Sequence, residues 1–146
     1  MTPDTDSLTL AWAAGFVDGE GCIHIAKTSH PSGRRSSYRL RLTLVQNCLE
    51  TLWTFQSALG IHAGLHRILR RLDHNKQCYT LTYDGKQARE VIQALLPYLV
   101  RKRTEALAAL AFYKEGRVDW HPGRNGCPEE LWRIRERYYR KLRSLK

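Results

Sequence analysis

The chain has 146 residues, of which 42% are hydrophobic and 26% charged, proportions that suit a folded protein with a core and exclude a disordered chain. Its formal net charge of +10, carried mostly by arginine, favours a nucleic-acid partner because the planar guanidinium pairs well with phosphate and guanine. The rival partner is an anionic membrane surface, and the lack of any apolar run long enough to cross a bilayer argues against it.

The first half of the chain predicts a helix, a hairpin and a second helix. Residues 8–17 are rich in Leu and Ala and follow possible N-cap oxygens, and the glycines that come next are expected to end this helix. Residues 22–28 and 38–45 alternate apolar with polar side chains, the period of a strand with one buried face, and a turn-rich stretch joins them. Residues 48–60 return to helical spacing.

The second half predicts another pair of strands and then three helices. The strands are expected at residues 64–72 and 77–83, and two helices at 85–99 and 101–115, hinged at a proline. A Pro/Gly-rich linker then leads to a very basic helix at about residues 129–145. This last helix is equally compatible with a solvated amphipathic face and with a DNA contact.

The element order predicts an α+β fold. We expect one four-stranded antiparallel sheet with helices on one face, in an αββαββα core at about residues 8–115. The other face of the sheet is left open. The length fits a single domain over residues 1–146.

Strand parity predicts which side chains occupy the open face. In the second strand, Leu40, Leu42 and Leu44 point to the core, so Arg39 and Arg41 point the opposite way. The third strand does not alternate cleanly, and either Arg67 or the pair Arg70 and Arg71 could face outward. A β-ribbon fits the major groove, so we expect the open face to act as a saddle for double-stranded DNA, the alternative being a merely hydrated sheet face. The residues expected to contact DNA are His24, Ala26, Thr28, Arg34, Arg35, Arg39, Arg41, Thr43, Arg67, Arg70, Lys76, Cys78 and Thr80.

The stretch "AAGFVDGEG", residues 13–21, places Asp18 and Glu20 two residues apart at the end of the first helix. It resembles the signature of the LAGLIDADG homing endonucleases, with glycines and Asp18 at matching positions and Glu20 in place of the second aspartate. The order of strands and helices over about residues 8–115 matches that family too. The resemblance implies a site-specific endonuclease that hydrolyses both strands of DNA with Mg²⁺, for which Mn²⁺ is expected to substitute.

A single copy of the motif implies a homodimer, because two copies of this helix pack together in the family. Ala11, Gly15 and Gly19 are four residues apart, as are Ala14 and Asp18, so one helix face carries little bulk. We therefore expect Ala11, Ala14, Gly15 and Asp18 at the dimer interface. Two-fold symmetry then predicts a pseudo-palindromic target, and the family resemblance implies an intron-encoded or free-standing mobile gene.

The catalytic roles follow from the same resemblance. Two Glu20 carboxylates, with the Gly19 carbonyl, are expected to hold Mg²⁺ over the DNA backbone. Asp18 is expected to hold the helix end and turn instead. Gln46 matches a polar residue that orders active-site water, with Asn47 as the alternative if the register shifts by one. Lys102 matches a basic residue near the scissile phosphate, although a solvated charge cluster remains an alternative for it.

The sequence leaves alternatives to nuclease activity. A non-cleaving binder on the same scaffold, either an RNA maturase that binds intron RNA or a DNA-binding regulator, is the second hypothesis. A structural zinc site at His62, His66, His74 and Cys78 is disfavoured because these residues fall on strands and turns. The acidic N-terminus and four cysteines without a CxxC pair favour an intracellular protein, in bacterial cytoplasm or an organelle.

Overall fold

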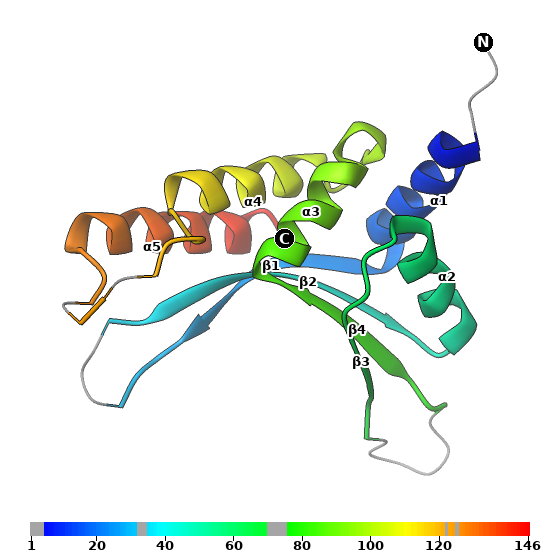
Figure 1. Ribbon diagram of the computed structural model, residues 1–146, viewed down its shortest axis with the longest axis horizontal. Helices are drawn as coiled ribbons and strands as arrows, with labels where there is room; N and C mark the ends of the chain where they lie inside the picture. The colour runs from blue at the N-terminus through cyan, green and yellow to red at the C-terminus, as the bar shows by residue number, and fades with distance from the viewer. Residues whose placement is uncertain (1–4, 32–34, 70–75, 122, 125) are drawn as a thin grey trace.

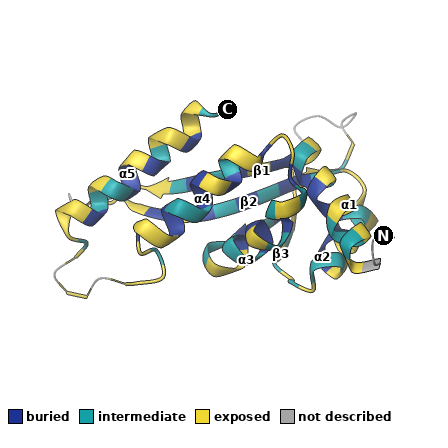
Figure 2. Ribbon diagram, turned by 90° about the horizontal axis from the view of Figure 1, so that it is seen from above, coloured by how far each residue is buried: buried dark blue, intermediate teal, exposed yellow. Residues whose placement is uncertain are grey.

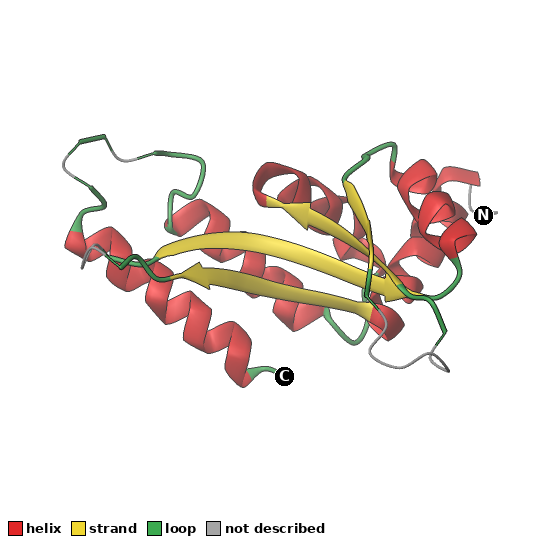
Figure 3. Ribbon diagram, turned by 90° about the horizontal axis from the view of Figure 1, so that it is seen from below, coloured by secondary structure: helices red, strands yellow, loops and turns green. Residues whose placement is uncertain are grey.

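The sheet forms a curved layer with all the helices on its convex side (Figure 1). The structure, a computed structural model, describes residues 5–31, 35–69, 76–121, 123–124 and 126–146. The four strands are antiparallel in the order β1-β2-β4-β3, so the predicted α+β architecture is confirmed. Seen from below, the concave side, the strands lie uncovered in front of the helices (Figure 3). The elements are α1 (Thr5–Glu20), β1 (Gly21–Thr28), β2 (Ser37–Gln46), α2 (Leu49–Leu59), β3 (Gly64–Arg67), β4 (Tyr79–Asp84), α3 (Gly85–Leu95), η1 (Leu96–Tyr98), α4 (Arg103–Glu115) and α5 (Glu129–Ser144).

Strand alternation sorts the side chains as the sequence predicts. Leu40, Leu42 and Leu44 of β2 are fully buried, and the residues between them are exposed or half-buried. The buried set packs against apolar residues of every helix from α1 to α5. One face of the sheet therefore belongs to the core, and the other is available to a partner.

Two predicted boundaries are wrong. The first helix does not stop at Val17 but continues to Glu20 and runs directly into β1. The third strand is far shorter than residues 64–72, ending at Arg67. As an edge strand it pairs with β4 alone, so few backbone hydrogen bonds extend it.

The register of β3 also determines on which face of the sheet Arg67 lies. Leu65 is opposite Leu81 and Arg67 is opposite Tyr79, so both share the parity of the covered face. His66, opposite Thr80, is the β3 side chain with the parity of the open face. The expectation that Arg67 points from the open face is therefore wrong, while its alternative Arg70 lies outside the described residues.

The basic C-terminal helix α5 packs on the helix layer and not on the open face. Its buried side chains include Leu131, Tyr138 and Leu142, and in Figure 2 its exposed residues face away from the sheet. Of the two alternatives, the structure therefore favours a solvated amphipathic face. Among the described residues, no helix combines the length and apolar character needed to cross a bilayer.

Glu136 joins α5 to the first hairpin. Its carboxylate accepts hydrogen bonds from Lys27 Nζ at 3.0 Å, from Arg140 Nε at 3.0 Å and from the Tyr38 hydroxyl. Burial acts to raise the pKa of Glu136, but these three donors outweigh it and lower the pKa below its usual value. A buried carboxylate with this many donors stays ionised and fixes the helix against the sheet.

We predict that Glu136→Ala lowers the free energy of unfolding by about 2–4 kcal/mol, because it leaves the buried Tyr38 hydroxyl and the partly exposed Lys27 ammonium without their acceptor. Chemical denaturation measures the change. Glu130→Ala, at an exposed position of the same helix, serves as the control and should shift the free energy by less than about 0.5 kcal/mol. Equal effects of the two substitutions would contradict this account of α5.

Candidate functional site

Lys102 holds the end of α1 from a distant part of the chain. Its Nζ donates to the carbonyl oxygens of Val17 at 3.0 Å and Asp18 at 2.7 Å. The last carbonyls of a helix lack intrahelical hydrogen-bond donors, and the Lys102 ammonium provides a donor for two of these carbonyls. Lys102 is only 9% exposed, so this contact is largely shielded from solvent.

The Asp18 side chain in turn accepts hydrogen bonds from the backbone around Lys102. Its Oδ1 accepts the Lys102 N–H and its Oδ2 accepts the Val100 N–H, both at 2.9 Å. Burial acts to raise the pKa of Asp18, but hydrogen bonds from the backbone of Lys102, Val100 and Arg101 lower the pKa below its usual value. Asp18 and Lys102 therefore clamp the end of α1 to the start of α4.

This clamp corrects the expected dimer interface. Asp18 is occupied by its own chain, and Ala14 is fully buried in the core, so neither is available to a second copy. The exposed face of α1 instead carries Ala11, Gly15 and Gly19. A β-carbon added at Gly15 would have nothing within 4 Å, so this face has open space above it.

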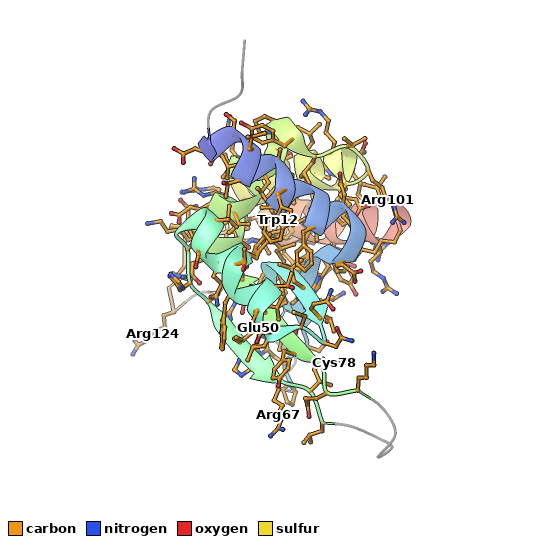
Figure 4. All side chains as sticks on the ribbon, turned by 90° about the vertical axis from the view of Figure 1, so that its right-hand side faces the viewer. Trp12, Glu50, Arg67, Cys78, Arg101 and Arg124 are labelled. Atoms are coloured by element: carbon orange, nitrogen blue, oxygen red, sulfur yellow. The ribbon has the colours of Figure 1, made fainter. Side chains whose placement is uncertain are left out.

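Sequence reasoning missed large apolar side chains beside the small residues. Leu8 is 57% exposed and Trp12 is 42% exposed, and Trp12 stacks on Phe16 with ring centroids 5.7 Å apart. Figure 4 looks onto α1 and α2, with Trp12 on the near side, and Trp53 of α2 is also exposed. The spacing of positions 8, 11, 12, 15 and 19 on one helix face was the available signal.

Glu20 is the last residue of α1, and its side chain is exposed where the helix meets the sheet. A β-carbon at the next position, Gly21, would lie 2.9 Å from the Val17 carbonyl oxygen, so only glycine permits the immediate entry into β1. Within the described residues, no group of three or more His, Cys, Asp or Glu side chains could hold a metal. Within the described part of one chain, Glu20 therefore does not belong to a ready-made cluster of metal ligands.

Gln46 ends β2 near the same corner, since Gly21 pairs with Leu44. Its side chain has the parity of Leu44, the covered face, and its Oε1 accepts the Asn47 N–H at 2.9 Å. Asn47, the alternative left open by the sequence, is exposed. The alternation of β2 favours Asn47 over Gln46 as the residue that faces outward.

The open face carries most of the residues expected to contact DNA. Arg41 lies between His24 of β1 and Asp84 of β4 in the register, and its Nε donates to Asp84 Oδ1 at 2.6 Å. The Asp84 carboxylate partly neutralises this arginine, a partner the sequence did not reveal. Seven predicted contacts share the uncovered parity: His24, Ala26, Thr28, Arg39, Arg41, Thr43 and Thr80.

The remaining predicted contacts lie in the connections between strands. Lys76 and Cys78 precede β4, with Lys76 exposed. Arg35 donates from Nη1 to the Cys127 carbonyl at 2.9 Å, so it supports the linker before α5. Arg34, like Arg70, lies outside the described residues.

The sequence profile of the LAGLIDADG endonuclease family matches residues 13–110. The chain belongs to the LAGLIDADG endonuclease family. DNA endonuclease I-CvuI of Chlorella vulgaris is 30% identical to this chain over 113 residues, which span 75% of this chain and 66% of that protein.

Solved structures share the whole fold. The structure of I-CvuI with the I-CreI target and magnesium, described as holding uncleaved DNA, superposes with a TM-score of 0.76 at 26% identity, covering 97% of this chain and 83% of that one. An archaeal intron-encoded homing endonuclease, I-Vdi141I, complexed with DNA, gives a TM-score of 0.76 at 13% identity, covering 97% of this chain and 86% of that chain, and shows the fold alone.

We predict that Asp18→Asn lowers the free energy of unfolding by about 1–3 kcal/mol at neutral pH, because the amide cannot accept both backbone N–H groups. The lowered pKa means that Asp18 stabilises the fold above its ordinary pKa of 3.8, and that this contribution is lost as the pH falls further. Denaturation between neutral pH and pH about 3 measures the difference from wild type, which should shrink on acidification. Exposed Asp119→Asn is the control, and a difference that grows with acidification would refute the clamp.

Proposed function

We propose that this LAGLIDADG protein is a site-specific DNA endonuclease that acts as a homodimer and cuts both strands of a long pseudo-palindromic target. The observation that carries the proposal is the place of Glu20. It ends the helix whose exposed face carries small residues, and it lies at the border of the open sheet face. A second copy packed on that helix would bring two carboxylates together beside bound DNA.

The surface of α1 supports self-association. Ala11, Gly15 and Gly19 leave the backbone accessible, and exposed Leu8 and Trp12 flank them with apolar area. Two such helices related by a two-fold axis can approach closely, as at small-residue interfaces. The same axis would then relate two open sheets, which accounts for a target with two similar halves.

The donor atoms at the end of α1 suit a hard divalent cation. The Glu20 carboxylate and Gly19 carbonyl are oxygen ligands at a helix C-terminus, where partial negative charge favours cations. Since Glu20 is not part of a ready-made ligand cluster in the described part of one chain, Glu20 of a second copy and phosphate oxygens would complete the site. Bound Mg²⁺ or Mn²⁺ would stabilise charge on the attacking and leaving oxygens of the phosphodiester.

The chain's own residues would position this chemistry. Lys102 holds the Val17 and Asp18 carbonyls and so fixes the direction in which Glu20 projects. We assign Lys102 a positioning role, with its charge close enough to favour a phosphate nearby. Gln46, or Asn47 in its place, would orient water at the same corner.

The open face would read the target. Arg39 is exposed there, and arginine pairs with guanine in the major groove. Neighbouring His24, Thr43 and Thr80 offer shorter polar contacts from adjacent strands. This arrangement would give sequence preference to the half-site that each chain covers.

A non-cleaving binder, either an RNA maturase for intron splicing or a DNA-binding regulator, is the second candidate. The exposed carboxylate at position 20 argues against binding alone, because an acidic group beside phosphates without a metal repels them. A maturase that retains nuclease activity would keep both functions. Cleavage of the uninterrupted insertion locus of the gene separates the candidates.

We predict that Glu20→Gln abolishes Mg²⁺-dependent cleavage of a plasmid carrying that locus, while binding of the same DNA is retained. The amide keeps the size of the side chain but loses the charge needed to hold the ion. Glu50→Gln, at an exposed position on α2, is the matched control and should cut at the wild-type rate. Cleavage by Glu20→Gln at the wild-type rate, or wild-type protein that binds without nicking, would overturn the catalytic proposal.

A further inference from the structure

A basic hollow lies at the end of the sheet opposite α1. It has a volume of about 1180 Å³ and lies between the far half of the first hairpin, the start of α3 and the linker that joins α4 to α5. In Figure 1 this linker is at the left, and α1 is at the right. The hollow is continuous with the open face, because Ala26, Thr28 and Arg39 of that face line it too.

The linker is held in place at both ends. Arg135, 8% exposed, donates from Nε to the Gly116 carbonyl at 2.7 Å and from Nη2 to the Arg117 carbonyl at 3.1 Å. Arg35 holds the other end through the Cys127 carbonyl at 2.9 Å. Gly116, Arg117 and Cys127 are therefore fixed to the rest of the fold.

The first residues of the linker are also fixed by local contacts. The Trp120 N–H donates to the Arg117 carbonyl at 3.0 Å, closing a turn. The Arg117 guanidinium lies over the Trp120 ring, 5.2 Å from its centroid. An ordered segment loses little conformational entropy when it binds a partner.

The charge of the hollow is strongly positive. Among the described residues, six Arg or Lys residues line it against one acidic residue, Asp119. Arg35 and Arg135 hold the linker and Arg41 is paired with Asp84, so these three are committed to the fold. Of the cations that the structure describes here, Arg39, Lys86 and Arg124 are left to meet a partner.

Lys86 forms only a weak ion pair. Its ammonium is 3.9 Å from Glu90, and its side chain is 75% exposed, so this pair contributes little and is screened by salt. Within the described part of the chain, Arg124 forms no ion pair. Exposed His121 follows Trp120 on the same linker. Such groups suit phosphodiester oxygens better than a neutral ligand.

We propose that the hollow is a cradle for the DNA phosphate backbone at the outer end of each half-site, with Lys86 and Arg124 as its phosphate contacts. The inference rests on the proposed function, which places the two-fold axis at α1. The hollow is at the far end of the sheet from that axis, so it would meet the base pairs furthest from the cut. These phosphate contacts would fix the length and register of the bound DNA without reading its base sequence.

Binding to two duplexes tests the cradle. The probe is the sequence that wild-type protein enriches from a library of random duplexes, made at full length and trimmed by about half a helical turn at both ends. The variant is Lys86→Ala/Arg124→Ala. The control, Lys114→Ala/Lys141→Ala, removes the same charge from exposed positions of α4 and α5, outside the hollow.

The slope of log affinity against log salt should fall by about 1.8 per chain in the variant on the full-length duplex, since each phosphate contact releases about 0.9 counterion. Because both chains of the homodimer lose these contacts, the affinity ratio between wild type and variant should change about tenfold over a twofold change in salt. Trimming the duplex should lower the affinity of wild-type protein and leave the affinity of the variant unchanged. The control should respond to trimming as wild type does.

Three outcomes would overturn the cradle. Wild-type protein could bind the full-length and trimmed duplexes with equal affinity, or the variant could bind both duplexes more weakly than wild type by the same factor. The control could also show the same affinities as the variant. Equal competition by duplex RNA of the same sequence would assign the hollow to RNA and also overturn it. Failure of wild-type protein to bind either DNA would instead refute the proposed function. The two failures are therefore distinguishable.

Discussion

The reciprocal hydrogen bonds between Asp18 and Lys102 fix the geometry on which the rest of the molecule depends. Through them the end of α1 is tied to the start of α4, more than 80 positions along the chain. Because α1 passes into β1 without a loop, the same contacts also set the position of the sheet. Glu20 follows directly, so the side chain we propose for catalysis inherits a fixed place between helix and sheet.

The two faces of the sheet divide stability from binding. Alternate residues of each strand enter a continuous core that includes residues of α5, while the residues between them face outward with arginine, histidine and threonine. Several arginines of this basic chain are structural: Arg135 holds carbonyls, and Arg41 is paired with a carboxylate. Net charge therefore overstates the number of cations that DNA can meet.

The fold could be predicted from the sequence because its main signal is local. Alternation in β2 and helical spacing elsewhere each span a few residues and need no knowledge of distant contacts. The end of α1 could not be predicted in this way. Two glycines suggested a stop, but an ammonium from Lys102 stabilises the final carbonyls and lets the helix continue.

The candidate site was predicted in part for a related reason. Small residues occur on two faces of α1, and spacing alone does not tell which face the core covers; the structure buries Ala14 and exposes Gly15. In the four-residue edge strand β3, the position of Arg67 depended on pairing with β4 rather than on its own sequence. Asp84 was overlooked because its partner Arg41 is adjacent only across the sheet.

The central claim is that two α1 helices pair so that two Glu20 carboxylates share the metal site. Anomalous scattering from Mn²⁺ in crystals of the protein with its DNA target tests it most directly. The account predicts manganese at the two-fold axis, within about 2.0–2.3 Å of Glu20 oxygens from both copies. Manganese coordinated by one copy alone, or protomers joined through a surface other than α1, would contradict it.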